Sequence, residues 1–328
     1  MKVFITGATG LLGSFICKEL IAQGHKVRAM KRNSSRMTLL GKTADEVEWV
    51  VGDMNDLSLL DEALEGIDAV IHGAAIISFD KRYAERMYQT NVLGTADLVN
   101  ASLKKDLKNF VHISSVAALG RKEGQKYIDE NDRWEGTSYD SIYARSKHQQ
   151  ELEVWRGSQE GLEVKIINPS VVLGPGLWGS SGSTSVFHYA YSEKAFYPAG
   201  NINVVDVRDV AEVAVILLNS KIKNERFVLS ADSMPFGVFF TKVARAFGKK
   251  EPQKVVKPWM LKIAVPLEFI RSRIMGNEAM ITKDTAILSK TKYHFKNDKV
   301  REKLNFEFRK VDESINWTVQ ELKQRHNL

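Results

Sequence analysis

The 328-residue sequence predicts an α/β protein in which a doubly wound parallel sheet is joined to a smaller, mostly helical C-terminal lobe. Through the first half of the chain, short runs rich in Val, Ile and Phe alternate with longer segments in which apolar residues recur every three or four positions. The runs are almost continuously apolar, which is typical of parallel strands covered on both faces. Their alternation with helical segments predicts crossover connections and therefore a parallel sheet.

The predicted elements alternate regularly as far as Pro169, after which a Gly- and Ser-rich stretch with aromatic residues is typical of a ligand-facing loop. Residues 203–218 return to strand and helix patterning, and from Ser233 onward the chain is more helical and more basic. We expect strands at residues 2–6, 26–30, 47–51, 69–72, 110–114, 164–168 and 227–229, and helices at 11–23, 57–64, 82–103 and 143–157. Residues 1–170 and 203–230 would form the larger domain, and 171–202 and 231–328 a substrate-binding lobe.

The composition limits the cellular setting and the partners. A single cysteine, Cys17, excludes an intramolecular disulfide and a thiolate metal cluster, so we expect a cytoplasmic protein without a metal site. The opening MKVFITGATG lacks a signal-peptide pattern, and no run approaches the roughly 18 apolar residues of a membrane-spanning helix. Residues 241–310 contain 18 Lys and Arg against 7 Asp and Glu and account for the net charge of +7. This excess is either a solvated basic face or a surface for anionic ligands or lipid headgroups, and we expect no nucleic-acid partner.

Three glycines follow the first predicted strand directly. The segment Gly7-Ala-Thr-Gly10-Leu-Leu-Gly13 leads into an amphipathic helix that begins near Leu11. In such a turn one glycine permits the sharp bend, one lets the backbone approach a pyrophosphate and one lets the helix lie close to the strand, while the helix N-terminus attracts negative charge. Because a strand precedes the glycines and a helix follows them, the sequence predicts dinucleotide binding on a Rossmann sheet.

Residues after the second and third strands indicate which dinucleotide binds. Where a carboxylate would bond the ribose hydroxyls of NAD, this chain has Lys31 and Arg32. A cationic side chain suits a 2′-phosphate, so Arg32, helped by Lys31, favours NADP over NAD unless both are solvated loop charges. Asp53, just past the third strand, is expected to accept a hydrogen bond from the adenine amino group; its alternative role is a helix cap.

A serine pair and a Tyr-x-x-x-Lys segment are candidates for the chemistry. Ser114 and Ser115 end the fifth predicted strand, and Tyr143 and Lys147 lie four residues apart on one face of a predicted helix. A phenol titrates at about 10, so it needs a neighbouring ammonium to stabilise its anion at neutral pH, and we expect Lys147 to be that neighbour. A serine hydroxyl at the carboxyl edge of the sheet would hold a substrate oxygen against Tyr143.

Taken in order, these motifs resemble the extended short-chain dehydrogenase/reductases, also described as the NAD-dependent epimerase/dehydratase family. The matching pieces cover residues 1 to about 215, and the remaining third of the chain matches only loosely. They read TGATGLLG, GDMND, HGAA, NVLGT, ISSVAALG, YARSK, NPSVVLGPG and VDVRDVAEV. The resemblance implies a Rossmann fold, a nicotinamide cofactor and an enzyme.

The resemblance also implies roles for individual residues. Tyr143 would exchange a proton with the substrate oxygen, Lys147 would also bind the nicotinamide ribose, and Ser115 would orient that oxygen, with Ser114 as the alternative. Asn91 would complete a proton relay or tie a helix to a strand. Beyond the residues already named, cofactor contacts are implied at Thr9, Leu11, Leu12, Met54, Ala74, Ala75, Pro169, Val171 and Val172.

Two subgroups of the family compete. Relatives of dihydroflavonol reductase and cinnamoyl-CoA reductase deliver hydride from NADPH to a ketone or aldehyde, whereas nucleotide-sugar epimerases and dehydratases return it to the sugar and hold NAD tightly. We favour an NADP-dependent reductase of a small organic carbonyl compound, with Tyr143 as general acid, because of Arg32, the segment NPSVVLGPG and an aromatic loop. The loop aromatics, which contact either the substrate or the core, are Trp178, Phe187, Tyr189, Tyr191 and Tyr197.

A third alternative is an NADP-binding sensor or scaffold without turnover. Residues 257–274 support it, because apolar side chains recur there at helical spacing among basic ones, although Pro266 should kink or break the helix. We favour a lid or subunit contact for this segment over a peripheral membrane contact. The family resemblance also suggests a homodimer built from the helices at residues 82–103 and 143–157.

Overall fold

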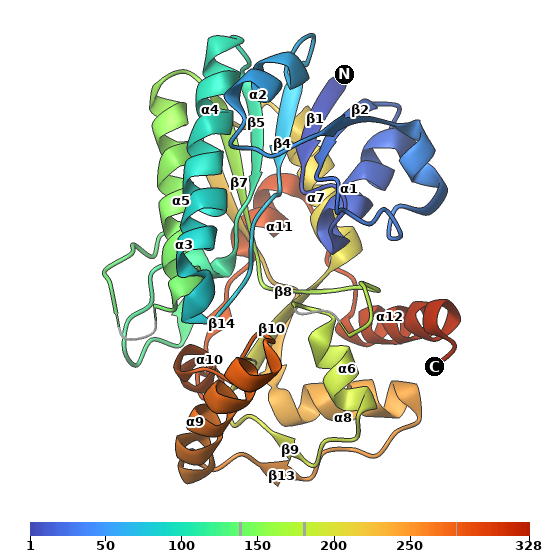
Figure 1. Ribbon diagram of the computed structural model, residues 1–328, viewed down its shortest axis with the longest axis vertical. Coiled ribbons are helices and arrows are strands. Elements are labelled where there is room, and N and C mark those ends of the chain that lie inside the picture. Colours follow the sequence, from blue (N-terminus) through green and yellow to red (C-terminus); the bar gives the residue numbers. More distant parts are fainter. Residues whose placement is uncertain (138–139, 180–181, 280) are drawn as a thin grey trace.

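The molecule is built around a seven-stranded sheet with helices on both faces (Figure 1). The computed structural model describes residues 1–137, 140–179, 182–279 and 281–328. The strands follow the order β11-β7-β5-β4-β1-β2-β3, and every neighbouring pair is parallel. The predicted doubly wound Rossmann sheet is therefore confirmed. The bounds are Lys2–Thr6 (β1), Lys26–Lys31 (β2), Val47–Val51 (β3), Ala69–His72 (β4), Asn109–Ile113 (β5), Glu163–Pro169 (β7) and Glu225–Leu229 (β11).

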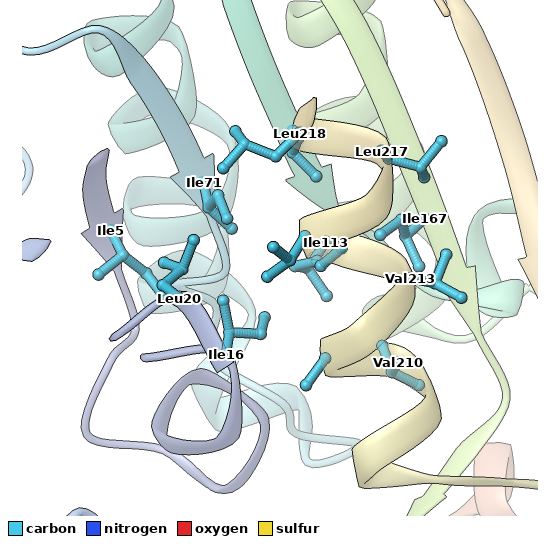
Figure 2. Close-up of a cluster of buried hydrophobic side chains, with 14 of the residues drawn as sticks. Ile5, Ile16, Leu20, Ile71, Ile113, Ile167, Val210, Val213, Leu217 and Leu218 are labelled. Atoms are coloured by element: carbon cyan, nitrogen blue, oxygen red, sulfur yellow. The ribbon is translucent and has the colours of Figure 1, made fainter. Parts of the chain in front are cut away.

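Two hydrophobic cores cover the two faces of this sheet. On one face α1 and α7 pack against the strands, and Figure 2 shows Leu20 of α1 and Val213 of α7 in one cluster with Ile71 and Ile113. On the other face α2, α4 and α5 bury Leu60, Leu98 and Val154 against Phe4 and Phe110. The helices are Leu11–Ala22 (α1), Leu57–Ala63 (α2), Gly94–Lys104 (α4), Ile142–Gln159 (α5) and Val207–Asn219 (α7).

The helix predicted at residues 82–103 contains a π-helical turn. The short helix α3 (Ala84–Met87) passes into the π turn at Tyr88–Leu93 and then into α4. Such a turn inserts an extra residue into the helical repeat and re-aims the side chains near it. Here it includes the fully buried Asn91. A homodimer through α4 and α5 stays a prediction.

A three-stranded sheet of order β12-β10-β8 organises the smaller lobe. Although β10 was expected to belong to the larger domain, it pairs with β8 and β12 and is not part of the seven-stranded sheet. Its side chains alternate, so that Val204 enters the core of the lobe and Val205 enters the core beneath α1 and α7. The elements of the lobe core are Val171–Leu173 (β8), Ser185–Tyr191 (α6), Asn201–Asp206 (β10), Asp232–Pro235 (β12), Phe236–Phe247 (α8) and Val311–His326 (α12).

The aromatic residues after Pro169 belong mainly to this lobe core. Phe187 is fully buried, and the Trp178 ring packs edge-on against those of Tyr191 and Phe247. Tyr189 and Tyr197 lie against the same cluster. The packing therefore favours the core alternative for these residues, which removes one of the reasons for expecting a reductase. Ser180 and Ser181 of this stretch lie outside the described residues.

Short elements connect the two parts and extend the lobe. The helix predicted near residues 257–274 is α9, and it runs through Pro266 without a break. Pro266 is exposed, so water can satisfy the carbonyl that the missing N–H leaves unpaired. The remaining elements are the 3₁₀ turns Gly41–Glu46, Lys81–Tyr83 and Val116–Ala118, with Tyr127–Ile128 (β6), Phe196–Tyr197 (β9), Lys254–Val255 (β13), Pro258–Met275 (α9), Lys283–Leu288 (α10), His294–Phe295 (β14) and Asp298–Leu304 (α11).

The strand order gives the large sheet one topological switch point. The chain winds outward from β1 through β2 to β3 on one side and through β4 to β5 on the other, so the connections diverge between β1 and β4. Sheets of this type bind ligands outside the carboxyl ends of the strands at such a point. Within the described parts of the chain, no helix is long and apolar enough to cross a membrane.

Candidate active site

The glycine turn lies where the connections diverge, and its backbone touches the chain that leaves β4. Gly7 has φ of +77°, and a Cβ there would come within 2.7 Å of Gly73 C and O. A Cβ on Gly13 would collide with the carbonyl of Gly7. Both positions therefore require glycine: Gly7 for the bend and its approach to β4, and Gly13 for the approach of α1 to the turn.

Gly10 differs because open space surrounds its α-carbon. A Cβ at Gly10 would meet only the Gly7 carbonyl oxygen, at 3.4 Å. Gly10 is also the N-cap of α1 and has no side chain that could accept from the first N–H groups of Leu11 and Leu12. A bare helix N-terminus beside open space fits a pyrophosphate, which accepts hydrogen bonds and is attracted by the helix dipole.

Thr6 joins the turn to the adjacent alanines. Its Oγ1 accepts a hydrogen bond from Ala74 N at 3.2 Å, so the chain after β4 is held beside the glycine turn. Ala74 is half-buried and Ala75 is exposed. Their small side chains leave room next to the turn, in keeping with the cofactor contacts implied for both residues.

Lys31 and Arg32, at the end of β2, differ in whether neighbouring side chains hold their charged groups. The Lys31 ammonium lies over the Trp49 ring, 5.2 Å from its centroid, and 3.6 Å from Met37 Sδ. Arg32 is exposed, and its backbone N–H donates to Ser35 Oγ at 3.1 Å. Because Lys31 is directed toward β3, Arg32 is the freer of the two to meet a phosphate.

The Asp53 carboxylate does not cap α2. It is exposed and accepts from Asn55 N at 3.3 Å, whereas Asp56 is the N-cap and accepts from Leu59 N at 3.1 Å. The alternative role of helix cap therefore falls to Asp56. The Met54 side chain is buried in the core beneath α2, which leaves only its backbone for the implied cofactor contact.

Ser115 and Tyr143 are hydrogen-bonded partners at the carboxyl edge. Ser115 follows β5, caps the 3₁₀ turn at Val116–Ala118 and forms a side-chain hydrogen bond with Tyr143. Tyr143 stands in the first turn of α5, where the N-cap Ser141 accepts from Ala144 N at 3.1 Å. Ser114 Oγ, by contrast, is buried with no hydrogen-bond partner among the described residues. The serine that acts on the pKa of Tyr143 is therefore Ser115, whereas Ser114 is not among the causes.

The ionisation of Tyr143 is governed mainly by burial. Burial raises the pKa of the Tyr143 phenol to about 12, and the hydrogen bond with Ser115 only partly opposes this rise. Lys147 is not among the causes of this shift, of which the loss of hydration is the largest, so the expected stabilisation of the anion by Lys147 stays a prediction. Tyr143 is therefore a protonated phenol at neutral pH, ready to donate a proton.

Lys147 is buried directly beneath the edge of the sheet. Its ammonium donates to the carbonyl oxygen of Ile113 at 3.1 Å and to Gln150 Oε1 at 2.5 Å. Burial lowers the pKa of Lys147 to about 7, and the Glu151 carboxylate acts in the opposite direction. The side chain is therefore anchored between β5 and its own helix.

Sequence reasoning missed the polar network behind Lys147. Since an ammonium can only donate, it fixes the Gln150 amide with Oε1 toward Lys147 and Nε2 toward Thr95 Oγ1, at 2.8 Å. His72 joins the network through Nε2, 2.7 Å from Thr95 Oγ1, and Nδ1, 2.7 Å from Thr6 Oγ1. The spacing of Lys147 and Gln150 on one helix was visible in the sequence, but the partners come from separate elements.

The Asn91 side chain has a structural set of partners. Its Oδ1 accepts from Ile76 N at 2.7 Å, and its Nδ2 donates to Ile76 O at 2.9 Å and to Ser146 Oγ at 3.1 Å. These bonds use both ends of the amide to join the chain after β4 to the π turn and to α5. The arrangement favours the tie between elements over the proton relay.

The segment after β7 leads from the large sheet into the smaller lobe. Pro169 ends β7, and Ser170 N donates to Leu229 O at 2.9 Å. Val171 packs toward the lobe core and Val172 toward the core of α1 and α7. The chain therefore passes between the core of the lobe and the core of α1 and α7. Thr9 of the glycine turn is half-buried.

Comparisons with known proteins agree with this geometry. The model of the NAD dependent epimerase/dehydratase family matches residues 3–230. A protein of Synechocystis sp. named for dihydroflavonol 4-reductase is 29% identical over 264 residues, which cover 78% of this chain and 76% of that protein. Cinnamoyl-CoA reductase 1 of Petunia hybrida is 27% identical over 248 residues, covering 71% and 73%.

Solved structures agree with the fold over the whole chain. The crystal structure of gox2253 has a TM-score of 0.83 at 28% identity and covers 99% of both chains. UDP-glucose 4-epimerase of Thermotoga maritima, with UDP-glucose, has a TM-score of 0.80 at 18% identity and also covers 99% of both chains. This second likeness shows the fold alone. The chain belongs to the NAD-dependent epimerase/dehydratase family and is an NAD(P)-dependent enzyme of the extended short-chain dehydrogenase/reductase type.

Replacing Gln150 should destabilise the protein, because Gln150→Leu removes the buried hydrogen bonds that the amide makes with the Lys147 ammonium and with Thr95 Oγ1. We expect the free energy of unfolding to fall by about 1–3 kcal/mol, measured by urea denaturation. The matched control is Gln149→Leu, at the exposed neighbouring position, which should change it by less than about 0.5 kcal/mol. Equal losses in the two variants would contradict the network.

The lowered pKa of Lys147 predicts a pH-dependent stability term. Between about pH 7 and its ordinary pKa of 10.5, the unfolded chain binds the proton and the folded chain does not, so this group makes the protein more stable as the pH rises. Lys147→Met lacks this gain. Urea denaturation of both proteins across this range should therefore show the wild type gaining stability relative to Lys147→Met. A difference that does not change with pH would contradict the shifted pKa.

Proposed function

We propose that the protein reduces a ketone or aldehyde group of a small organic substrate, with NADPH as the hydride donor and Tyr143 as the general acid. The observation that carries the proposal is the hydrogen-bonded pair of Ser115 and a protonated Tyr143 at the carboxyl edge of the sheet. The reduced nicotinamide supplies the hydride for the carbonyl carbon. The carbonyl oxygen then gains electron density and takes the phenol proton, while Ser115 holds that oxygen in place.

The protonated form of the phenol is the form that carbonyl reduction needs. Reduction of a carbonyl group requires a proton donor, and a phenol whose pKa is raised to about 12 carries its proton at neutral pH. Oxidation of an alcohol would need the phenolate, which burial disfavours here. Lys147 is anchored by Ile113 O at the end of β5 and by Gln150 of its own helix α5. From this position it would also bind the nicotinamide ribose. The two relatives described above are named as reductases, which supports the same direction.

The preference for NADPH rests on the loop after β2. The exposed Arg32 would bind the 2′-phosphate by charge-assisted hydrogen bonds, and no carboxylate lies between Lys31 and Ser35 to bind the ribose hydroxyls of NAD. Asp53 is exposed beyond β3, where it would accept from the adenine amino group. The bare N-terminus of α1 would receive the pyrophosphate.

A substrate panel distinguishes this proposal from its alternatives. Carbonyl compounds and nucleotide sugars are incubated with NADPH or NADH, the absorbance of the reduced cofactor is followed, and sugar products are analysed for epimerisation. Net oxidation of NADPH with a carbonyl compound supports the reductase. A sugar product formed without net oxidation would identify an epimerase or dehydratase, and cofactor binding without any turnover would favour a sensor.

Removing the Tyr143 hydroxyl should abolish turnover and spare the cofactor site. Tyr143→Phe loses the proton donor, so we expect kcat to fall by at least about a hundredfold while the Kd for NADPH stays within a few-fold. Fluorescence titration and the absorbance assay measure the two quantities. Tyr127→Phe, at an exposed tyrosine in β6, is the matched control and should keep full activity. Unchanged turnover in Tyr143→Phe would refute the assigned role.

Removing the Arg32 cation should affect the two dinucleotides unequally. Arg32→Ala loses a phosphate contact that only NADPH offers, so its Kd should rise by about tenfold or more while the Kd for NADH changes little. Lys31→Ala should have the smaller effect, since that ammonium is already held over Trp49. Equal weakening of NADPH and NADH by Arg32→Ala would show that Arg32 does not bind the 2′-phosphate.

A further inference from the structure

The helix α9 turns an apolar stripe toward solvent. The stripe residues recur every three or four positions, which places them on one face of the helix, and each is more than half exposed. The opposite face carries the half-buried Leu261 and Val265 and the buried Ser272. The stripe is therefore surplus to the packing of the lobe. Its members are Trp259, Ile263, Leu267, Ile270 and Ile274, with Phe269 and Met275 also more than half exposed beside it.

Basic side chains border the stripe on both sides. By the 3.6-residue repeat, Lys262 and Arg273 follow one border and Arg271 follows the other. The acidic residue of α9 is Glu268, whose side chain is only 11% exposed and pairs with Arg271 at 2.7 Å. Because Glu268 pairs with Arg271, the positive charge beside the apolar band comes from Lys262 and Arg273 on one border.

The combination of apolar and basic groups decides which partner fits. A second copy of this chain would bring the same basic borders together around a two-fold axis, which like charges oppose. The interface of an anionic membrane matches both the apolar stripe and the basic borders. The stripe would enter the region where the acyl chains begin, and the cations would contact the anionic headgroups. We propose that α9 lies in the interface of an anionic lipid bilayer, parallel to its surface, in place of the lid or subunit contact that the sequence favoured.

The stripe is connected to the mouth of the candidate active site. Just beyond α9, Asn277 O accepts from Arg82 Nη2 at 2.7 Å, and Ala279 N donates to Asp80 Oδ2 at 3.2 Å. The same loop carries Phe79, whose ring lies 5.7 Å from that of Tyr143. A bilayer bound by α9 would thus be linked by these contacts to the loop whose Phe79 ring contacts Tyr143.

Vesicle sedimentation of the full-length protein tests the proposal directly. The purified chain is centrifuged with vesicles of phosphatidylcholine alone and with vesicles in which about a third of the lipid is phosphatidylglycerol. We expect the protein to sediment with the anionic vesicles, to stay mostly in the supernatant with the neutral ones, and to be released from the anionic vesicles by salt. Protein that stays in the supernatant with anionic vesicles at low salt would overturn the proposal.

Single substitutions then identify the surface. Ile270→Glu should lower the partition coefficient on anionic vesicles by about tenfold or more, and Leu152→Glu, on an equally exposed apolar residue of α5, should leave it unchanged. Thermal melts of both variants show that the chain still folds. Combined Lys262→Gln and Arg273→Gln should weaken binding to anionic vesicles selectively.

Two results would overturn the assignment to α9. One is binding by Ile270→Glu equal to that of the wild type. The other is an oligomer in light scattering that Ile270→Glu dissociates, together with no binding to vesicles, which would make α9 a subunit contact.

Discussion

The buried ammonium of Lys147 is the constraint on which the arrangement of the site depends. A cation removed from water needs hydrogen-bond acceptors, and here they are the carbonyl of Ile113 at the end of β5 and the amide of Gln150 one turn further along α5. Satisfying Lys147 therefore fixes α5 against β5. Tyr143, one turn earlier on the same helix, is thereby held at the carboxyl edge where Ser115 can reach it.

The same burial explains the charge states of the groups around Lys147. Burial lowers the pKa of His72 to about 3, with the Lys147 charge acting in the same direction, so the ring is neutral and can bridge Thr6 and Thr95. His112, stacked on His72 with ring centroids 5.1 Å apart, has its pKa lowered by the same causes. Both imidazoles behind Lys147 are therefore neutral at neutral pH.

The smaller lobe shows how two cores share one strand. β10 sends Val204 into the lobe and Val205 toward α1 and α7, so the lobe cannot move far without disturbing the larger core. α12 strengthens this link, since Trp317 packs on Phe15 of α1 with ring centroids 5.8 Å apart. α9 takes no part in these cores, and Ser272 is its only buried residue among those the structure describes. A surface helix outside the shared packing is free to present apolar groups outward.

The sequence by itself determined the parallel sheet and the glycine turn, because each depends on local period or on fixed spacing along one element. It also predicted Tyr143 and Lys147 from their spacing on one helix and Ser115 from the family resemblance. β1 and β4 could be bounded to the residue, since a strand covered on both faces is marked by a nearly uninterrupted apolar run. The bounds of the edge strand β3, which contains Glu48, were also predicted to the residue. Only the tertiary structure decided the place of β10, the packing of Trp178 and Phe187, the partners of Gln150 and Asn91, and the raised pKa of Tyr143. These depend on burial and on contacts between elements far apart in the chain, and neither the spacing nor the type of a residue records how much water its neighbours exclude.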